Sequence, residues 1–176
     1  MGKFEDNGMA ILMIGNHFSW WDGFFAHYLN MKFLKRRFNV MMLEGELENR
    51  MFLNKIGAFS INKGSRSAIE SINFLKTLLK DKKNMVLYYP QGVFQSVYDQ
   101  SIHFESGISK ILKGFTHNDM QVLFYAAMLD YFAEKKPMLT FNISEYKLEN
   151  GISQSEIESA YNQFYKGCIK NLIDSL

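Results

Sequence analysis

The chain has 176 residues, a length that suits one domain with a single core, and its composition is globular, with 47% hydrophobic and 22% charged residues. Lys and Arg number 20 against 18 Asp and Glu, and a net charge of +2 argues against a dedicated nucleic-acid binder. The one cysteine, Cys168, excludes a disulfide framework and is expected to be a buried thiol. We therefore expect one domain over residues 1–176 and no nucleic-acid partner.

Short apolar runs alternate with longer amphipathic segments along the whole chain. In chain order we expect a strand at 9–14, a helix at 20–38, strands at 39–43 and 59–61, a helix at 66–80, strands at 85–89, 122–127 and 138–143, and a helix at 154–176. Strands separated by helices predict an α/β fold, a single domain whose mixed, mostly parallel sheet is flanked by helices.

Two sharp polar corners each follow a predicted buried strand. Gly15-Asn16-His17 comes after the first strand, and Pro90-Gln-Gly92 comes after the strand at 85–89. Because chemistry in α/β sheets gathers in loops after the carboxyl ends of strands, these corners predict a site.

The common catalytic signatures are missing from the sequence. It has no Gly-x-Ser-x-Gly elbow, Walker loop, dinucleotide fingerprint or His-Glu-x-x-His motif, and its four histidines are too scattered to suggest a metal site. We therefore expect no metal and no cofactor.

His17 and Asp22 form the candidate catalytic pair. They stand five positions apart, after a strand and at a helix start; if Ser19 caps that helix, Asp22 lies in its first turn and can reach back to the imidazole. A carboxylate on one ring nitrogen makes the other nitrogen a stronger base, able to take a proton from a hydroxyl or an amine. The spacing alone equally fits an aspartate that serves only the helix dipole.

Four segments together resemble the lysophospholipid and glycerolipid acyltransferases, a membrane-associated family that moves acyl chains from thioesters to lipid acceptors. Asn16-His-x-x-x-x-Asp22 resembles the first motif of that family, and Gly57 to Lys63 resembles its second block, a glycine followed six positions later by a basic residue. Segment 87–92 resembles the third block, usually Phe-Pro-Glu-Gly-Thr-Arg, and 104–107 resembles the segment that opens the next helix. The resemblance covers residues 9–143.

The resemblance implies an acyltransferase that uses an acyl thioester donor, on coenzyme A or acyl carrier protein, as a co-substrate and a lipid acceptor. It implies His17 as the general base, with Asp22 steadying the imidazolium. The residues that it implies for substrate binding are Asn16, Ser19, Lys63, Arg66, Tyr89, Pro90, Gln91 and Gly92.

The third block departs from the family pattern in ways that bear on the acceptor. Gln91 replaces the usual glutamate, and Val93-Phe94 replaces the usual Thr-Arg. Arginine binds phosphate through a bidentate fork that phenylalanine cannot replace. We therefore expect a hydroxyl or amine acceptor without the usual phosphate, although Lys63 and Arg66 can still supply phosphate charge.

Three other activities remain open on the sequence. The first is a standard 1-acylglycerol-3-phosphate acyltransferase that tolerates these substitutions. The second is a catalytically degenerate relative that binds lipid or acyl carrier protein, and the third is a thioesterase with water as the acceptor.

Two further groups of residues can each be interpreted in two ways: the basic run Lys32, Lys35, Arg36, Arg37, and the paired Met41 and Met42. The cations suit either anionic lipid headgroups or a solvated helix end, and the methionines suit either an acyl groove or the core.

The membrane relationship of the chain is predicted from two further features. The longest apolar run, 122–129, is far shorter than the ~20 residues that a membrane-crossing helix needs. Relatives usually carry several dozen residues before the first motif, often a membrane-docking helical segment, whereas His17 has sixteen residues ahead of it. We expect a chain short of that segment, cytoplasmic and peripheral at the inner face of the membrane.

Overall fold

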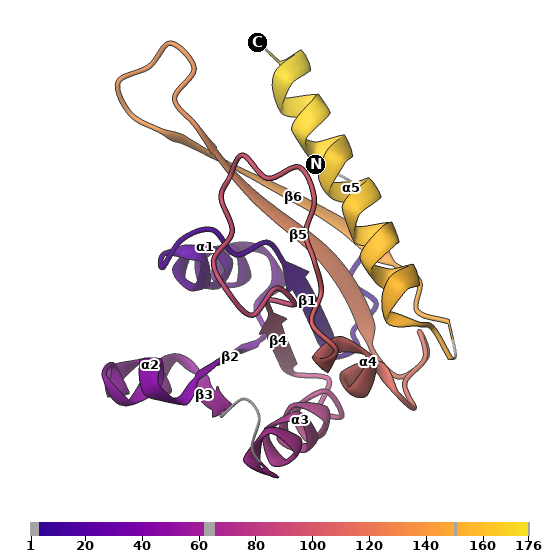
Figure 1. Cartoon of the computed structure of the whole chain (residues 1–176). Helices are drawn as coiled ribbons and strands as arrows, with labels where there is room; N and C mark the ends of the chain where they lie inside the picture. The colour runs from indigo at the N-terminus through magenta and orange to yellow at the C-terminus, as the bar shows by residue number, and fades with distance from the viewer. Residues whose placement is uncertain (1–3, 62–65, 150, 176) are drawn as a thin grey trace.

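The computed structural model describes residues 4–61, 66–149 and 151–175, which form a six-stranded sheet flanked by helices (Figure 1). The strands are β1 (Ile11–Gly15), β2 (Arg37–Leu43), β3 (Ala58–Ile61), β4 (Asn84–Tyr88), β5 (Gln121–Asp130) and β6 (Met138–Tyr146). The helices are α1 (Asp22–Leu29), η1 (Asn30–Leu34), α2 (Glu44–Glu48), η2 (Met51–Ile56), α3 (Arg66–Leu78), α4 (Gly107–Leu112) and α5 (Gln154–Asp174). This architecture confirms the predicted single-domain α/β fold.

The sheet has the order β3-β2-β4-β1-β5-β6. Every pairing is parallel except that of β5 with β6, which is antiparallel, so the mixed, mostly parallel character is also confirmed. β1 lies between β4 and β5, with Ile14 of β1 opposite Tyr88 of β4. The segments that follow β1 and β4 therefore leave the same edge of the sheet side by side.

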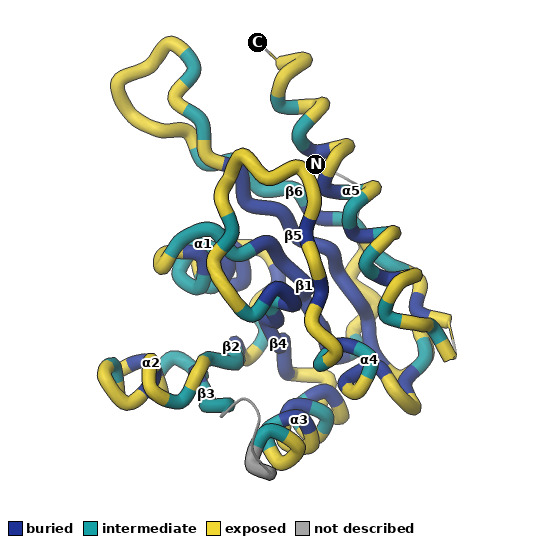
Figure 2. Tube along the Cα trace, in the orientation of Figure 1, coloured by how far each residue is buried: buried dark blue, intermediate teal, exposed yellow. Residues whose placement is uncertain are grey.

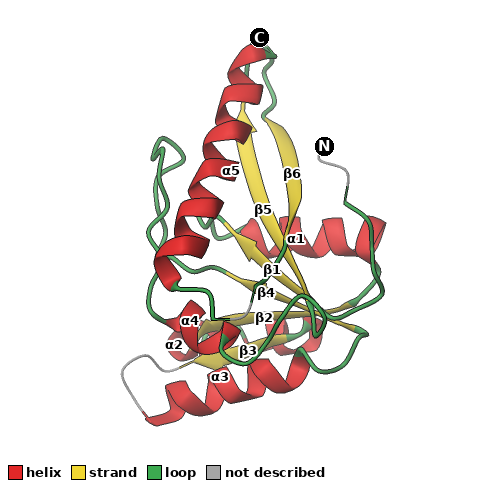
Figure 3. Cartoon of the chain, turned by 90° about the vertical axis from the view of Figure 1, so that its right-hand side faces the viewer, coloured by secondary structure: helices red, strands yellow, loops and turns green. Residues whose placement is uncertain are grey.

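Helices cover both faces of the sheet, which is why its central strands read as continuous apolar runs (Figures 2 and 3). Leu12 and Ile14 of β1 belong to the core that α3, α4 and α5 cover. Ile11 and Met13 belong to the opposite core, which α1 and η1 cover together with Leu47 of α2. α5 lies on the other side of the sheet from α1 (Figure 3).

The helix expected at 20–38 is shorter than predicted, and its last residues belong to a strand. α1 begins at Asp22 and continues as the π-helical turn η1, which ends at Lys35 because this residue takes the left-handed conformation with φ 54°. The Asn30 side chain then bonds both the N–H and the carbonyl of Arg36, and β2 begins at Arg37. Arg36 and Arg37 are therefore not part of a helix end.

The segment between β2 and β3 contains two short helices that the sequence pattern did not predict. α2 and η2 have five and six residues, too few for a helical period to show in the sequence. η2 ends at Gly57, where φ is +93° and an added Cβ would lie 1.9 Å from the carbonyl oxygen of Phe38. Glycine is thus required where the chain turns back to lay β3 against β2.

Candidate active site

The two corners predicted to form a site meet at the carboxyl ends of β1 and β4. The chain can bring them together because Gly15 has no side chain. A Cβ there would lie 2.8 Å from Cδ1 of Tyr125 and 3.2 Å from Cε1 of Tyr89. The absence of a Cβ therefore lets two aromatic rings contact the main chain immediately before His17.

His17 and Asp22 form a hydrogen-bonded pair. His17 Nδ1 lies 2.9 Å from Asp22 Oδ2, and the carboxylate is fully buried while the imidazole is about one quarter exposed. A carboxylate can only accept, so Nδ1 is the donor, and the tautomer of the neutral imidazole that fits this contact has its lone pair on Nε2. The pair therefore has the arrangement that a general base requires.

Asp22 also organises the main chain around His17. Its Oδ2 accepts hydrogen bonds from the N–H groups of Phe18, at 2.7 Å, and Ser19, at 2.8 Å. Ser19 does not cap α1: the N-cap is Trp21, and the Ser19 hydroxyl accepts from the Trp21 N–H at 3.2 Å. Asp22 nevertheless lies in the first turn of α1, as expected.

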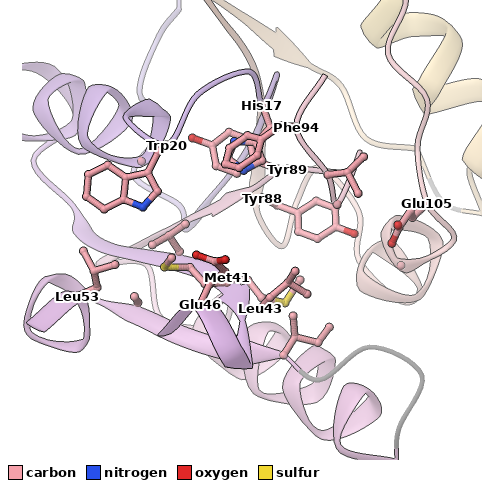
Figure 4. A pocket seen from close by; sticks show the side chains of 18 of the residues that line it. His17, Trp20, Met41, Leu43, Glu46, Leu53, Tyr88, Tyr89, Phe94 and Glu105 are labelled. Carbon is pink, nitrogen blue, oxygen red and sulfur yellow. The ribbon is translucent and has the colours of Figure 1, made fainter. Parts of the chain in front are cut away.

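The His17 ring lies between two aromatic rings (Figure 4). Tyr89 stacks on it, with centroids 4.2 Å apart and planes at 11°, and Phe94 contacts it at 4.3 Å and 39°. Burial, and then the neighbouring Tyr125 and Asp22, raise the pKa of Tyr89 well above its usual value. The phenol therefore stays protonated at neutral pH, and its stacking restricts the imidazole to one plane.

A pocket of about 430 Å³ opens beside His17 (Figure 4). Its walls are mainly apolar and come from elements on both faces of the sheet, among them α1 and α3. Met41 and Met42 of β2 are among the lining residues. Trp20 and Leu53 lie toward one end, and Tyr88 points toward Glu105 at the other (Figure 4). Its volume and lining are those of a site for an apolar small molecule.

Two charged side chains line the described part of this pocket, and both are acidic. Glu46 of α2 is ion-paired with Arg50, whose guanidinium lies 5.5 Å from the ring centroid of Trp20. Burial, and then Glu105, raise the pKa of Tyr88 above its usual value. The sequence pattern did not indicate Glu46 and Leu53 as pocket residues, because both lie in the two short helices between β2 and β3 that it did not predict.

Three of the predicted substrate-binding residues are buried and bond the main chain of other segments of the protein. Asn16 is buried, and its side chain donates to the Ala127 carbonyl and accepts from the Ala127 N–H, both at 2.9 Å. Gln91 is also buried and bonds the main chain of His17. Pro90 is buried, and its carbonyl accepts from the Glu105 N–H at 2.8 Å.

The remaining predicted residues differ in how far the structure describes them. Tyr89 and Gly92 line the pocket. Arg66 is the first residue of α3, and its side chain is outside what the structure describes. Lys63 lies outside the described residues altogether.

A reactive cysteine or a cluster of metal-ligating side chains would offer other chemistry in the part of the chain that the structure describes. Burial raises the pKa of the Cys168 thiol to about 11, so it is protonated at neutral pH, and its burial confirms the prediction. Among the residues that the structure describes, no three His, Cys, Asp or Glu side chains gather as a metal site requires.

Comparison with known proteins assigns the family. A family model described as Acyltransferase matches residues 4–127, which is more than half of the chain and includes both corners of the site. The chain belongs to the acyltransferase family, so it is an acyl-transferring enzyme, and the resemblance found in the sequence is confirmed. No curated protein and no solved structure matches the chain significantly. None of the helices in the described part of the chain is long and apolar enough to span a membrane.

Proposed function

We propose that the protein transfers a fatty acyl chain from a thioester, on coenzyme A or acyl carrier protein, to a hydroxyl or amine of a lipid-like acceptor. The observation that carries this proposal is the buried Asp22 carboxylate on Nδ1 of His17 at the mouth of an apolar pocket. Nε2 takes the acceptor proton as the acceptor oxygen or nitrogen attacks the thioester carbon. The intermediate then collapses, the C–S bond breaks, and the departing sulfur receives the proton from the imidazolium. General-base help of this kind contributes about 10²–10⁴ in rate.

The oxyanion of the intermediate needs donors other than the main chain beside His17. The N–H of His17 is bonded to Gln91, and those of Phe18 and Ser19 are bonded to Asp22. The N–H of Gly92 is likewise bonded, to the Tyr89 carbonyl at 3.2 Å. We therefore propose the main-chain N–H groups of Val93 and Phe94, which line the pocket next to the imidazole, as the oxyanion donors. The acyl chain would lie against Met41, Met42 and the other apolar walls, where methionine adapts to a flexible ligand.

Product analysis tests this function against its rivals. Long-chain acyl-CoA and acyl carrier protein donors are offered with acceptors that carry or lack a phosphate, and products are identified by mass. An acylated acceptor supports the proposal, and a dominant preference for monoacylglycerol phosphate identifies the standard enzyme instead. Fatty acid release that is independent of acceptor indicates a thioesterase. Binding to lipid vesicles without transfer from any donor indicates a degenerate relative.

The acceptor is proposed to lack a phosphate next to the catalytic pair, because Phe94 stands where the third block of the family usually has an arginine. Its ring lines the pocket against His17 and is 58% exposed, so it can meet an apolar or neutral group but cannot bind an anion.

Phe94→Arg is expected to raise the preference for phosphorylated over neutral acceptors by about 10- to 100-fold, since a charge-assisted contact adds about 1.5–3 kcal/mol. Competition between the two acceptor types, read by mass, measures this ratio. Tyr98→Arg places the same charge on the same loop but outside the pocket, where Tyr98 is 89% exposed, and should leave the ratio unchanged. Equal ratios in the two variants would contradict the role of Phe94.

A membrane surface is the proposed source of the acceptor. Trp21, Tyr28 and Met31, on and beside α1, are each at least half exposed, and Lys32 lies over the Tyr28 ring at 5.8 Å. We call these four residues the α1 surface; it begins beside Trp20 at the pocket. Of the basic run, Arg36 pairs with Asp6 and Arg37 with Asp81. Lys32 and Lys35 form no ion pair among the described residues and suit anionic headgroups.

Trp21→Ser combined with Met31→Ser is expected to weaken binding to phosphatidylcholine vesicles containing phosphatidylglycerol by about 10-fold or more, because each side chain loses apolar burial. Cosedimentation measures the partition coefficient. Ile173→Ser is the matched control, since Ile173 on α5 is 59% exposed and far along the chain from the α1 surface. Unchanged binding by the double variant would rule out this surface.

A further inference from the structure

Both main-chain polar groups of His17 are held by residues that follow β4. The N–H of His17 donates to Gln91 Oε1 at 2.6 Å, and the carbonyl of His17 accepts from the Gln95 N–H at 2.9 Å. Gln91 Nε2 donates to Gln95 Oε1 at 2.5 Å and lies 3.5 Å from the His17 carbonyl oxygen. Gln91 is 4% exposed and does not line the pocket, whereas Gly92, Val93 and Phe94 do.

The orientation of the Gln91 amide follows from these partners. A main-chain N–H can only donate, so the atom facing His17 N–H must be the oxygen. Nε2 then faces Gln95, whose own amide turns its oxygen inward to accept. The short contact with His17, at 2.6 Å, is therefore made by an acceptor oxygen, which a carboxylate at position 91 would also supply; the bond from Nε2 to the His17 carbonyl is long, at 3.5 Å.

Gln91 and Asp22 both hold the loop that contains His17. Asp22 binds the His17 imidazole and the next two N–H groups, and Gln91 binds the N–H of His17 itself. A shift of the imidazole by about 1 Å can lower a rate by about 10²-fold. A residue that fixes this loop therefore acts on the rate of transfer and not on acceptor affinity.

We propose that Gln91 is a positioning residue that holds His17 in line for proton transfer, with Gln95 as its partner, and that it does not bind the acceptor. This inference rests on the proposed role of His17 as the base. On this inference, the two departures from the family pattern in the third block have different effects. The amide of Gln91 keeps the acceptor oxygen that the His17 N–H needs, whereas Phe94 changes the side chain that the pocket presents to the substrate.

Three variants test the inference through the separation of kcat from KM. Gln91→Met keeps the shape of the side chain but removes the acceptor oxygen, so kcat should fall about 10-fold or more while both KM values change less than about 2-fold. Gln91→Glu restores an acceptor, and the Gln95 amide can rotate to donate to it, so kcat should return to within about 3-fold of the parent. In the double variant Gln91→Glu with Gln95→Glu, two carboxylates face each other, so kcat should again be about 10-fold below that of the parent.

The kinetic constants of these variants decide whether the inference holds. Parental kcat in Gln91→Met, or a change in acceptor KM at constant kcat in Gln91→Glu, overturns the inference. If Gln91→Met does not fold, as circular dichroism would show, equal kcat in Gln91→Glu and in the double variant overturns it. Failure of the proposed function is distinguishable, because the parent protein would then form no acylated acceptor, or His17→Ala would form it at the parental rate. Failure of this inference alone leaves the parent active and His17→Ala inactive.

Discussion

His17→Ala is expected to lower acyl transfer by about 10²–10⁴-fold, because it removes the proposed base while the thioester and the acceptor still bind. The phenol that stacks on the imidazole cannot replace it at neutral pH. The nearest phenol, Tyr89, has a pKa raised by burial and by its neighbours, so it stays protonated. Turnover of a long-chain acyl thioester measures the loss, with products identified by mass.

The fold should survive this change. The His17 side chain lies in a loop and is about one quarter exposed, and its loss removes one hydrogen bond and two ring contacts. We expect the free energy of unfolding to fall by about 1–2 kcal/mol, measured by denaturant titration. His103→Ala is the matched control, because His103 is 81% exposed in its side chain and lies outside the pocket. Near-parental turnover in His17→Ala would exclude the general-base mechanism.

The position of the site was predictable from the sequence because it depends on where buried strands end and on local polarity. Two of the predicted buried strands, now β1 and β4, are followed by polar corners, and parallel strands bring their carboxyl ends to one end of the sheet. That the two corners meet depends on β1 and β4 being neighbours, which the structure adds. The resemblance to the acyltransferases added the roles of His17 and Asp22, and the structure brings their side chains within hydrogen-bond distance.

The details that the sequence could not provide arise from long-range contacts. Nothing in the local pattern indicates that Asn16 bonds the main chain of Ala127, or that Gln91 faces the N–H of His17, since both partners lie far along the chain. The helix at 20–38 was overextended because its end depends on the left-handed Lys35, a conformation that non-glycine residues seldom take.

Asp22→Asn is expected to lower kcat by about 10²–10⁴-fold with little change in either KM, because the imidazolium that forms during transfer loses the charge that stabilises it. Asparagine has the same shape, and its oxygen can still accept from the N–H groups of Phe18 and Ser19. The loop is thereby retained, and the variant isolates the charge of Asp22 from its structural role. Steady-state kinetics with saturating donor and varied acceptor give the two constants separately.

Comparison with Asp22→Ala completes this argument. Alanine removes the acceptor for three donors around a fully buried position, so the free energy of unfolding should fall by about 2–4 kcal/mol in addition to the loss of kcat. Asp81→Asn is the control, because Asp81 pairs with Arg37 at an exposed position, where a lost ion pair changes stability little. If Asp22→Asn kept kcat within about 3-fold while Asp22→Ala unfolded, Asp22 would be a structural residue only, and the basicity of His17 would not depend on its charge.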